Sequence, residues 1–243
     1  MELRGRTALV TGAGHRVGRA IAVGLGARGM RVAVHYNAAA DGAQETVRQI
    51  QDAGGDADVI SADLTKADAA ERLIAAVVAR FGALDVLVNS AAVMVRTPFG
   101  EITPKQWDDI MALNVRAPFF LAQAAAPHLR ASRGVIVNIA DLAAFEAWPA
   151  YVPHGISKSG VVHMTRSLAR VLAPEVRVAA VAPGTVLLPD NWSKADQEHL
   201  RLTTPLARTG SPDDVTKTVL FILDADYLTG ETIIVDGGRH VRG

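Results

Sequence analysis

A chain of 243 residues can form one large α/β domain, and 49% hydrophobic and 21% charged residues are typical of a globular protein with a large buried core. Its 25 Lys and Arg residues balance 25 Asp and Glu residues, which argues against nucleic acid or a membrane surface as a partner and favours a small-molecule substrate. The absence of cysteine excludes disulfides and thiolate metal sites. No stretch approaches the ~20 apolar residues of a membrane helix and no signal-peptide pattern opens the sequence, so we expect a cytoplasmic protein.

Short apolar runs alternate with longer helical patterns along the whole chain. Strands are predicted at Thr7–Thr11, Arg31–His35, Asp58–Ala62, Asp85–Asn89, Gly134–Ile139, Arg177–Val181 and Thr232–Val235. Helices are predicted near residues 17–29, 42–53, 67–81, 104–131, 151–173 and 212–224, with caps at Asp41, Thr103 and Ser211. This alternation predicts a single domain over residues 1–243, a Rossmann-like, doubly wound α/β fold with a parallel sheet of about seven strands and helices on both faces.

The longest irregular stretch covers residues 184–211 and contains Pro189, Trp192 and Pro205. A loop of this length in a compact domain is typical of a lid or a binding loop, and a solvated excursion is the alternative. Because ligands of such folds bind beyond the carboxyl ends of the strands, we expect the functional site there.

The first predicted strand runs directly into a glycine-rich turn, TGAGHRVG at residues 11–18, and a helix begins at once. Glycine lets the backbone turn sharply and approach a pyrophosphate, while the helix N-terminus offers free N–H groups. A strand before the turn and a helix after it strengthen this interpretation. The predicted cofactor contacts of the turn are Gly12, His15, Arg16, Val17 and Gly18.

The second predicted strand leads into His35, Tyr36 and Asn37, where many NAD-binding folds carry an acidic residue for the ribose. No carboxylate at this place repels a 2′-phosphate, and His15 and Arg16 add basic groups on the adjacent turn. The pattern therefore predicts NADPH as the cofactor, with contacts from these three strand-end residues. The alternative is that they are solvated turn residues, as charges on turns usually are.

Small or polar residues follow the next three predicted strands. Asp63 and Leu64 come after the third strand, Asn89 and Ala91 after the fourth, and Asp141 after the fifth. In a doubly wound sheet these positions border the crevice where the strand order reverses. We therefore expect all five to line one site, although each alone is also typical of an ordinary strand-end turn.

Taken in order, these pieces resemble the short-chain dehydrogenase/reductase superfamily over essentially the whole chain. The motifs that carry the resemblance are Thr11–Gly18, Asp63, Asn89–Ala91, Asn114, Asp141, Lys158, Pro183–Gly184 and Val235–Gly238. The resemblance implies that Asp63 contacts adenine, that Pro183 and Gly184 lie beside the nicotinamide, and that Lys158 binds the cofactor ribose. It also implies that Asn114 organises the lysine and water, and that Asp141 takes the place of the catalytic serine.

Four features within the superfamily resemble the pteridine reductases and their bacterial dihydrofolate-reducing relatives. They are Arg16 in place of the middle glycine, the pair His35–Tyr36, Asp141, and the segment VAPGTVLLPDN at residues 181–191. The resemblance to this branch implies NADPH-dependent reduction of a pterin-like C=N bond, with Asp141 taking part in protonating the substrate. A carbonyl or quinone reductase is the alternative enzyme, since substrate identity resides in the variable loop.

The branch resemblance implies that Arg16 and Asp141 touch the substrate, and Leu188 in the segment after the sixth strand is a further predicted contact. Trp148 and Trp192 flank the expected crevice, and Trp192 is the fourth predicted substrate contact, with plain packing as the alternative for both. The superfamily resemblance also implies a homotetramer, with the 104–131 and 151–173 helices paired between subunits. The remaining histidines have no metal-ligand spacing, and we expect no metal site.

The clearest departure from the superfamily lies four residues before Lys158, where its tyrosine is replaced by His154. The spacing from Asp141 to His154 matches that between the superfamily's serine and tyrosine. An imidazole ordinarily has a pKa near ~6.5, against ~10 for a phenol, and it is cationic when protonated. Lys158 disfavours that cation, whereas a close Asp141 favours it. The predicted catalytic residues are thus Asn114, Asp141, His154 and Lys158.

Three hypotheses about the proton follow from this replacement. In the first, Asp141 and His154 act as a pair, directly or through one water, because an imidazole ends short of a phenol's hydroxyl. In the second, Tyr151 moves in as the donor, which its place on the loop before Pro153 disfavours. In the third, the chain binds NADP without turnover, as a catalytically quiet protein.

Overall fold

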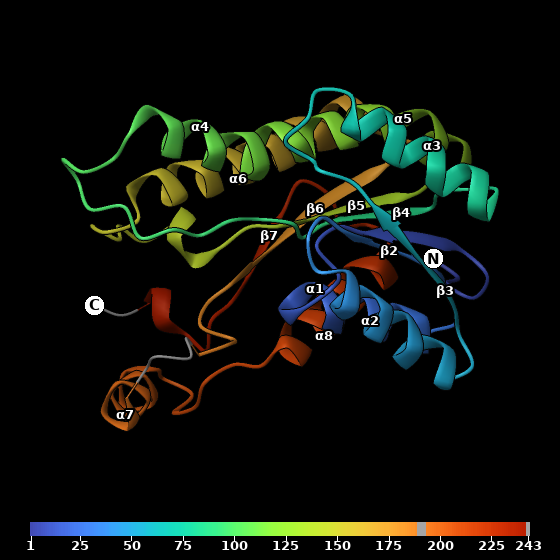
Figure 1. The fold of residues 1–243 in the computed structure, drawn as a ribbon. Coiled ribbons are helices and arrows are strands. Elements are labelled where there is room, and N and C mark those ends of the chain that lie inside the picture. Colours follow the sequence, from blue (N-terminus) through green and yellow to red (C-terminus); the bar gives the residue numbers. More distant parts are fainter. Residues whose placement is uncertain (189–192, 242–243) are drawn as a thin grey trace.

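A computed structural model of the chain, which describes residues 1–188 and 193–241, has a seven-stranded parallel sheet at its centre (Figure 1). The strands are β1 (Thr7–Val10), β2 (Arg31–Tyr36), β3 (Asp56–Ser61), β4 (Val86–Asn89), β5 (Val135–Ile139), β6 (Arg177–Pro183) and β7 (Thr232–Val235). Their order is β3-β2-β1-β4-β5-β6-β7 and every neighbouring pair is parallel. The predicted doubly wound α/β fold with seven strands is confirmed.

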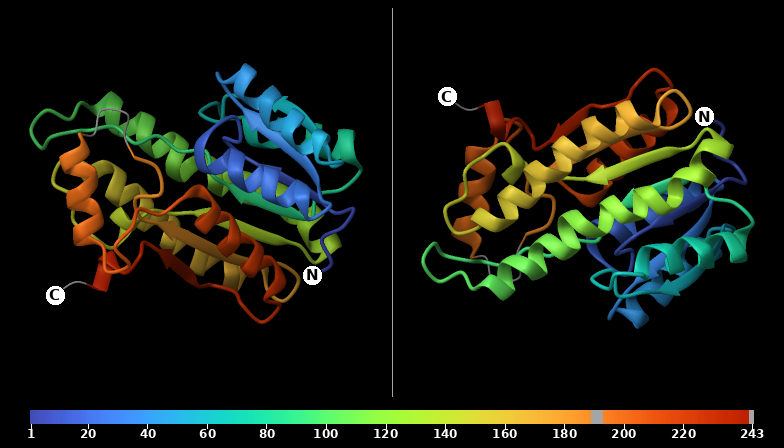
Figure 2. Two further views of the ribbon diagram at one scale, coloured as in Figure 1. Left: turned by 90° about the horizontal axis from the view of Figure 1, so that it is seen from below. Right: turned by 90° about the horizontal axis from the view of Figure 1, so that it is seen from above.

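Helices cover both faces of this sheet (Figure 2). One face carries α3 (Ala69–Phe81), α4 (Pro104–Met111), α5 (Ala117–Ser132) and α6 (Val152–Leu172). The other carries α1 (Arg16–Ala27), α2 (Ala40–Asp52) and α8 (Pro212–Asp224), while α7 (Lys194–Thr203) lies beyond the strand ends. Short 3-10 turns follow β5 at Leu142–Ala144 and β7 at Arg239–Val241.

Alternation along β1, an interior strand of the sheet, shows how the apolar core is divided into two layers. Ala8 and Val10 of β1 join the cluster beneath α1 and α8, whereas Leu9 between them joins the cluster beneath α3 and α5. Successive side chains of a strand point to opposite faces, so a strand covered on both faces reads as a continuous apolar run. This is why the buried strands were recognisable in the sequence.

Two helical features differ from the prediction. The predicted helix 104–131 is interrupted by a π-helical turn at Ala112–Arg116, between α4 and α5. The predicted irregular stretch 184–211 contains α7, which begins with a reciprocal capping box between Ser193 and Asp196. Capping boxes also start α4 at Thr103 and α8 at Ser211, as predicted. The predicted cap Asp41 instead lies inside the first turn of α2, which begins at Ala40.

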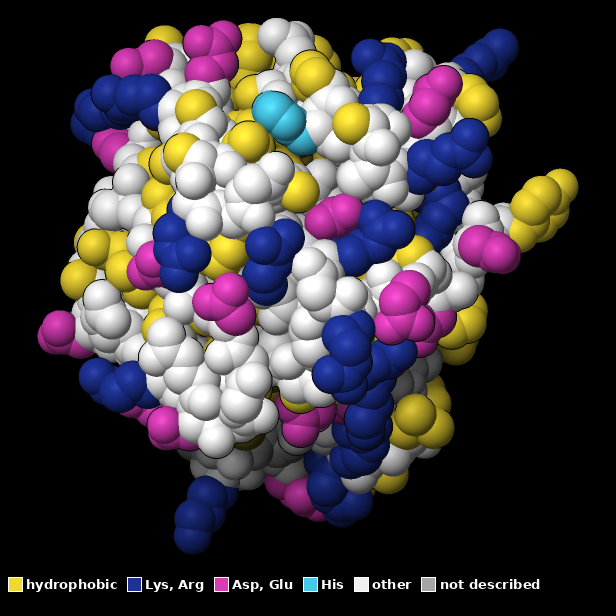
Figure 3. Space-filling view, turned by 90° about the vertical axis from the view of Figure 1, so that its right-hand side faces the viewer, with side chains coloured by type: hydrophobic (Ala, Val, Ile, Leu, Met, Phe, Trp, Pro, Cys, Tyr) yellow, Lys and Arg dark blue, Asp and Glu magenta, His cyan; other side chains and the backbone are white. Residues whose placement is uncertain are grey.

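The surface at the end where the chain begins carries both signs of charge. Figure 3 shows Lys and Arg side chains over this side with Asp and Glu side chains among them. Among the described residues, no helix is long and apolar enough to cross a membrane. The carboxyl ends of the parallel strands meet at the opposite end of the sheet (Figure 1). A cleft runs along these strand ends.

Candidate functional site

A cleft of about 800 Å³ runs along the carboxyl ends of the strands. The predicted site residues that line it are Gly12, His15, Arg16, Val17, Gly18, His35, Tyr36, Asn37, Asp63, Leu64, Ala91, Asp141, His154, Lys158, Pro183 and Gly184. Three predicted residues with described positions, Asn89, Asn114 and Leu188, are not part of this lining. Trp192, the remaining predicted substrate contact, lies outside the described residues. The sheet order thus brings most of the predicted site into one cavity.

The glycine-rich turn after β1 is packed too closely for side chains. Gly12 has φ +66°, and a Cβ there would lie 2.9 Å from the Cα of Ala91. A Cβ on Gly18 would collide with the carbonyl oxygen of Gly12. Helix α1 starts directly after this turn, and its first N–H groups have no partners within the helix. The turn therefore offers backbone donors and a positive helix end to an anion in the cleft, as a dinucleotide's pyrophosphate requires.

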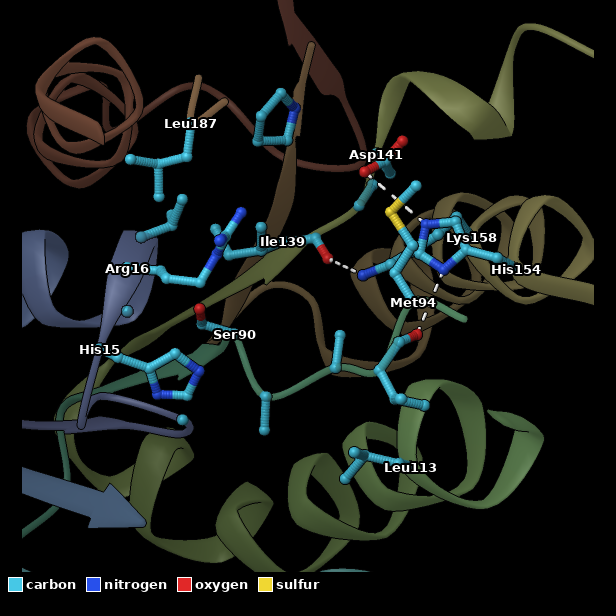
Figure 4. Close-up of a pocket in the computed structure, with 18 of the residues that line it drawn as sticks. His15, Arg16, Ser90, Met94, Leu113, Ile139, Asp141, His154, Lys158 and Leu187 are labelled. Carbon is cyan, nitrogen blue, oxygen red and sulfur yellow. Dashed lines mark hydrogen bonds and ion pairs between the residues drawn. The ribbon is translucent and has the colours of Figure 1, made fainter. Parts of the chain in front are cut away.

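Arg16 has an unusual backbone conformation for a residue with a side chain. Its φ of +52° is in the left-handed region, which costs a non-glycine residue about 1 kcal/mol. The superfamily resemblance places a glycine here, and this φ explains that preference. The exposed Arg16 side chain extends into the cleft beside His15 and Ser90 (Figure 4). Strain of this kind concentrates at ligand sites, which fits the predicted role of Arg16 as a cofactor and substrate contact.

His35 supports the turn from behind instead of presenting a charge to the cofactor. The backbone N–H of Gly12 donates to Nδ1 of His35 at 3.1 Å, so the ring proton is on Nε2, which lies 3.0 Å from the Ala62 carbonyl oxygen. The side chain is 2% exposed, and burial lowers its pKa to about 4. Both ring nitrogens bind the backbone, so a cofactor contact of His35, which lines the cleft, stays a prediction that excludes a charged imidazole.

Asp63 is held by the residues that follow it. Its Oδ1 accepts hydrogen bonds from the side chain and the backbone N–H of Thr65, at 2.7 and 3.0 Å. These bonds hold the pKa of Asp63 below its usual range, so the group is a carboxylate at neutral pH. It lines the cleft together with Tyr36 and Asn37 at the β2 and β3 side, where the adenosine half of a dinucleotide is predicted to bind.

Asn89 points into the core and not into the cleft. Its Nδ2 donates to Oδ1 of Asn138 at 2.9 Å, and Nδ2 of Asn138 donates in turn to Oγ1 of Thr165 at 2.9 Å. These three buried side chains tie β4 and β5 to α6. Asn89 is not part of the cleft lining and its predicted cofactor contact stays a prediction, whereas Ala91, two residues further, lines the cleft.

Lys158 is buried at the bottom of the cleft on α6. Its Nζ donates one hydrogen bond, 2.8 Å long, to the carbonyl oxygen of Ile139 at the end of β5 (Figure 4). Burial lowers the pKa of Lys158 to about 8, and the negative charge of Asp141 opposes that shift. An ammonium has three donors, so the described residues leave two of them for a ligand.

Asp141 and His154 face each other beside this lysine (Figure 4). His154 Nδ1 lies 3.3 Å from the carbonyl oxygen of Val93, which can only accept, so Nδ1 carries a proton. Its Nε2 lies 3.7 Å from Oδ2 of Asp141 and has no hydrogen-bond partner among the described residues. The His154 side chain is 3% exposed and that of Asp141 is 23% exposed. The carboxylate is therefore the member of the pair that reaches the open cleft.

Asn114 lies in the π-helical turn and holds the backbone of Val93. Its Oδ1 accepts from the Val93 N–H, and its Nδ2 donates to the Val93 carbonyl oxygen, both at 2.9 Å. The second proton of Nδ2 goes to Oγ of Ser157 at 3.0 Å. The predicted role of Asn114 in organising Lys158 and water stays a prediction, since the described hydrogen bonds of its side chain go to Val93 and Ser157. The same side chain holds the Val93 carbonyl oxygen that Nδ1 of His154 contacts.

Several cleft residues were not predicted as site residues. Val93, Met94, Thr185 and Arg239 line the cleft, and only the folded chain places them there. Tyr151, the disfavoured donor, also lines it, next to Trp148 with ring centroids 6.3 Å apart. Among residues 1–188 and 193–241, no group of three or more His, Asp or Glu side chains is placed to bind a metal ion.

Comparison with known proteins gives matches along nearly the whole chain. A family model described as enoyl-(acyl carrier protein) reductase matches residues 12–240. The chain is 37% identical to the granaticin polyketide synthase putative ketoacyl reductase 2 of Streptomyces violaceoruber, over 96% of both chains. It is 34% identical to 3beta-hydroxysteroid dehydrogenase 1 of Eggerthella lenta, over 98% of this chain and 94% of the other. It is 36% identical to a 3-oxoacyl-[acyl-carrier-protein] reductase of Staphylococcus aureus, over 97% of this chain and 98% of the other.

Solved structures agree with these matches. A putative short-chain alcohol dehydrogenase from Sinorhizobium meliloti superposes with a TM-score of 0.94 at 34% identity, over 100% of this chain and 99% of the other. A short-chain dehydrogenase/reductase mutant from Serratia marcescens superposes with a TM-score of 0.92 at 31% identity, over 99% of this chain and 100% of the other.

Proposed function

This chain belongs to the short-chain dehydrogenase/reductase superfamily, and we propose that it is an NADPH-dependent reductase of a carbonyl compound. One arrangement carries the proposal. Lys158, Asp141 and His154 lie together at one part of a cleft whose other part is the glycine-rich turn at the start of α1. The names of the similar proteins refer to a ketoacyl, oxoacyl or hydroxysteroid substrate, which favours a keto group over a pterin C=N bond for this chain.

The closely packed turn fits a dinucleotide. The turn can keep this close packing only with glycine at positions 12 and 18, where a Cβ would meet Ala91 and the Gly12 carbonyl oxygen. The open N-terminus of α1 that follows the turn complements the charge of a pyrophosphate. When bound, NADPH would supply the hydride. The NADPH preference is supported by Tyr36 at the end of β2 and Asn37 after it, which carry no negative charge, and by the cationic Arg16 in the same cleft.

Asp141 would donate the proton to the substrate, and His154 would then reprotonate Asp141. Nδ1 of His154 keeps its proton on the Val93 carbonyl, so Nε2 is the ring nitrogen that faces Oδ2 of Asp141, 3.7 Å away. Of the two groups the carboxyl is the more exposed, so it would deliver the proton to the substrate oxygen. Lys158 has free donors for the cofactor ribose, and its charge faces the same carboxyl group.

Reduction of a pterin-like C=N bond is the second candidate. Arg16 in a left-handed conformation and a carboxyl group at position 141 are the observations that favour it, since both belong to the pteridine reductase pattern. A protein that binds NADP without turnover is the third candidate function. For the enzymatic functions, Tyr151 in the cleft is the alternative proton donor to Asp141 and His154.

A homotetramer through the outer face of α5 and α6 belongs to the same proposal. Phe119 and Phe120 on α5 are 42% and 43% exposed and line a second depression with Met164 of α6. Exposed apolar patches of this kind mark protein interfaces. Light scattering of the purified chain in solution would give the mass of four chains if the proposal is right, and of one chain if it is wrong.

An assay of NADPH oxidation separates the enzymatic readings. The substrates are a keto ester, a ketone, a quinone, dihydrobiopterin and dihydrofolate, with NADH as the control cofactor. We expect turnover of the keto ester with NADPH, and about tenfold slower turnover after His154→Ala with unchanged NADPH binding. Preferential turnover of a pterin would support the second candidate, and tight NADPH binding without any turnover would support the quiet protein. Loss of activity in Tyr151→Phe instead of His154→Ala would identify Tyr151 as the donor.

A further inference from the structure

Arg239 is a cleft residue from the C-terminal segment of the chain. It begins the 3-10 turn after β7, and its Nη1 donates a 2.9 Å hydrogen bond to Oγ1 of Thr185. Thr185 follows the Pro183–Gly184 turn at the end of β6, and both Thr185 and Arg239 line the cleft. This contact joins segments 54 residues apart in sequence and fixes a guanidinium group at the wall of the cavity.

The charge of Arg239 is not neutralised by the described part of the chain. No carboxylate among those residues forms an ion pair with it. Asp236, three residues earlier, is occupied by the N–H groups of Gly238 and His240 and by Nδ1 of His240 at 2.8 Å. Within residues 1–188 and 193–241, the half-buried Arg239 guanidinium has one hydrogen-bond partner, the Thr185 hydroxyl. It therefore keeps donors for a planar anion, which it can bind with two parallel hydrogen bonds.

The cofactor's phosphates bind elsewhere in the proposed complex. They belong to the turn after β1 and the N-terminus of α1, whereas Thr185 lies at the end of β6. β6 is separated from β1 by β4 and β5, which is roughly 14 Å at the usual strand spacing. The neighbouring Pro183–Gly184 turn is the predicted place of the nicotinamide, which carries no negative charge. An anion at Arg239 is therefore part of the substrate.

Apolar and aromatic side chains also line this part of the cleft. Met94 lies beside His154, Leu187 comes from the opposite side of the cavity, and the rings of Trp148 and Tyr151 also line it (Figure 4). Such walls bind a hydrocarbon or aromatic body, while a single cation fixes its orientation.

We propose that Arg239 binds a carboxylate of the substrate, so that the preferred substrate is an oxo acid with an apolar body. This inference rests on the proposed carbonyl reduction. The carboxylate on Arg239 and the keto oxygen toward Asp141 hold the substrate at two points, and the apolar body lies between the walls formed by Met94 and Leu187.

The test compares an aromatic keto acid with its methyl ester in wild type, Arg239→Met and Arg239→Lys. Lys217→Met, which removes an exposed cation from α8, is the control. We expect Arg239→Met to lower kcat/KM for the acid about tenfold or more and for the ester less than about twofold, with KM for NADPH unchanged. Arg239→Lys should recover part of the preference for the acid, and the control should keep all of it.

Three results would overturn the inference. If Arg239→Met lowers kcat/KM equally for the acid and the ester, Arg239 has a structural role only. If Arg239→Met weakens NADPH binding, Arg239 binds the cofactor. If the wild type does not prefer the acid to the ester, Arg239 does not determine specificity. Calorimetry of the keto acid with the NADP-loaded protein provides a readout that needs no turnover. If no carbonyl compound is reduced but Arg239→Met still weakens binding of the acid about tenfold, the anion site stands and the proposed reaction fails.

Discussion

Protonation of His35 should destabilise the folded protein at mildly acidic pH. The folded chain keeps this ring neutral with a pKa of about 4, whereas the unfolded chain protonates it at its ordinary value of 6.5. The unfolded state therefore binds more protons below pH 6.5, and stability falls as the pH falls until the folded pKa is passed. Between about pH 7.5 and about pH 4.5, this one group should lower the free energy of unfolding by about 2.5 kcal/mol.

His35→Phe isolates this contribution from that of the carboxylates. At neutral pH the variant should be less stable than wild type by about 2–5 kcal/mol, since the Gly12 N–H and the Ala62 carbonyl oxygen both lose their partner. Between about pH 7.5 and about pH 4.5, the free energy of unfolding of His35→Phe should fall by about 2.5 kcal/mol less than that of wild type. Urea unfolding followed by tryptophan fluorescence at both pH values measures the difference, with the exposed His199→Gln as control. Parallel pH profiles for wild type and His35→Phe would refute the reasoning.

Three further changes probe the cofactor site and the lysine. Gly12→Ala should weaken NADPH binding about tenfold or more in a fluorescence titration, because its Cβ would meet Ala91. Gly54→Ala is the control, since Gly54 also has a positive φ of +82° but no atom within 4 Å of its Cβ position, and it should leave NADPH binding unchanged. Arg16→Gly should raise the free energy of unfolding by about 1 kcal/mol through relief of its φ, and should reduce the preference for NADPH over NADH in steady-state kinetics. Lys158 needs its proton to act as a donor, so kcat/KM should decline above about pH 8, and Lys158→Arg should shift that decline to higher pH in a measured pH profile.

The strands could be predicted because a covered parallel sheet leaves a direct signature. Buried runs of Val, Ile, Leu and Ala have the length of a strand and are bounded by turns, so each predicted strand overlaps an observed one. The boundaries differ where hydrogen bonding continues past the apolar run. β6 extends to Pro183, because pairing with β7 continues through Pro183 and Val235. β3 begins at Asp56, two residues before its predicted start, because it pairs with Arg31 of β2.

Side-chain direction was the part of the site that the sequence could not supply. His35 and Asn89 stand at strand ends, where the register decides which side chain meets the cleft and which meets the core. Asn114 lies in a π-helical turn, and no residue pattern marked that turn in advance. Arg239 reaches the cleft only through its tertiary contact with Thr185. Motif spacing therefore predicted where along the chain the site residues lie. The folded structure shows which of their side chains face the cleft and which face the core.

The claim that Asp141 delivers the proton during carbonyl reduction can be tested in one measurement. Single-turnover reduction of a keto ester by the NADPH complex is followed by loss of NADPH and by chromatography of the alcohol, for wild type and Asp141→Asn. The account predicts one alcohol per NADPH consumed by wild type, and a rate about a hundredfold lower in Asp141→Asn with NADPH binding unchanged. An unchanged rate in Asp141→Asn, or NADPH consumption by wild type without alcohol, would contradict it.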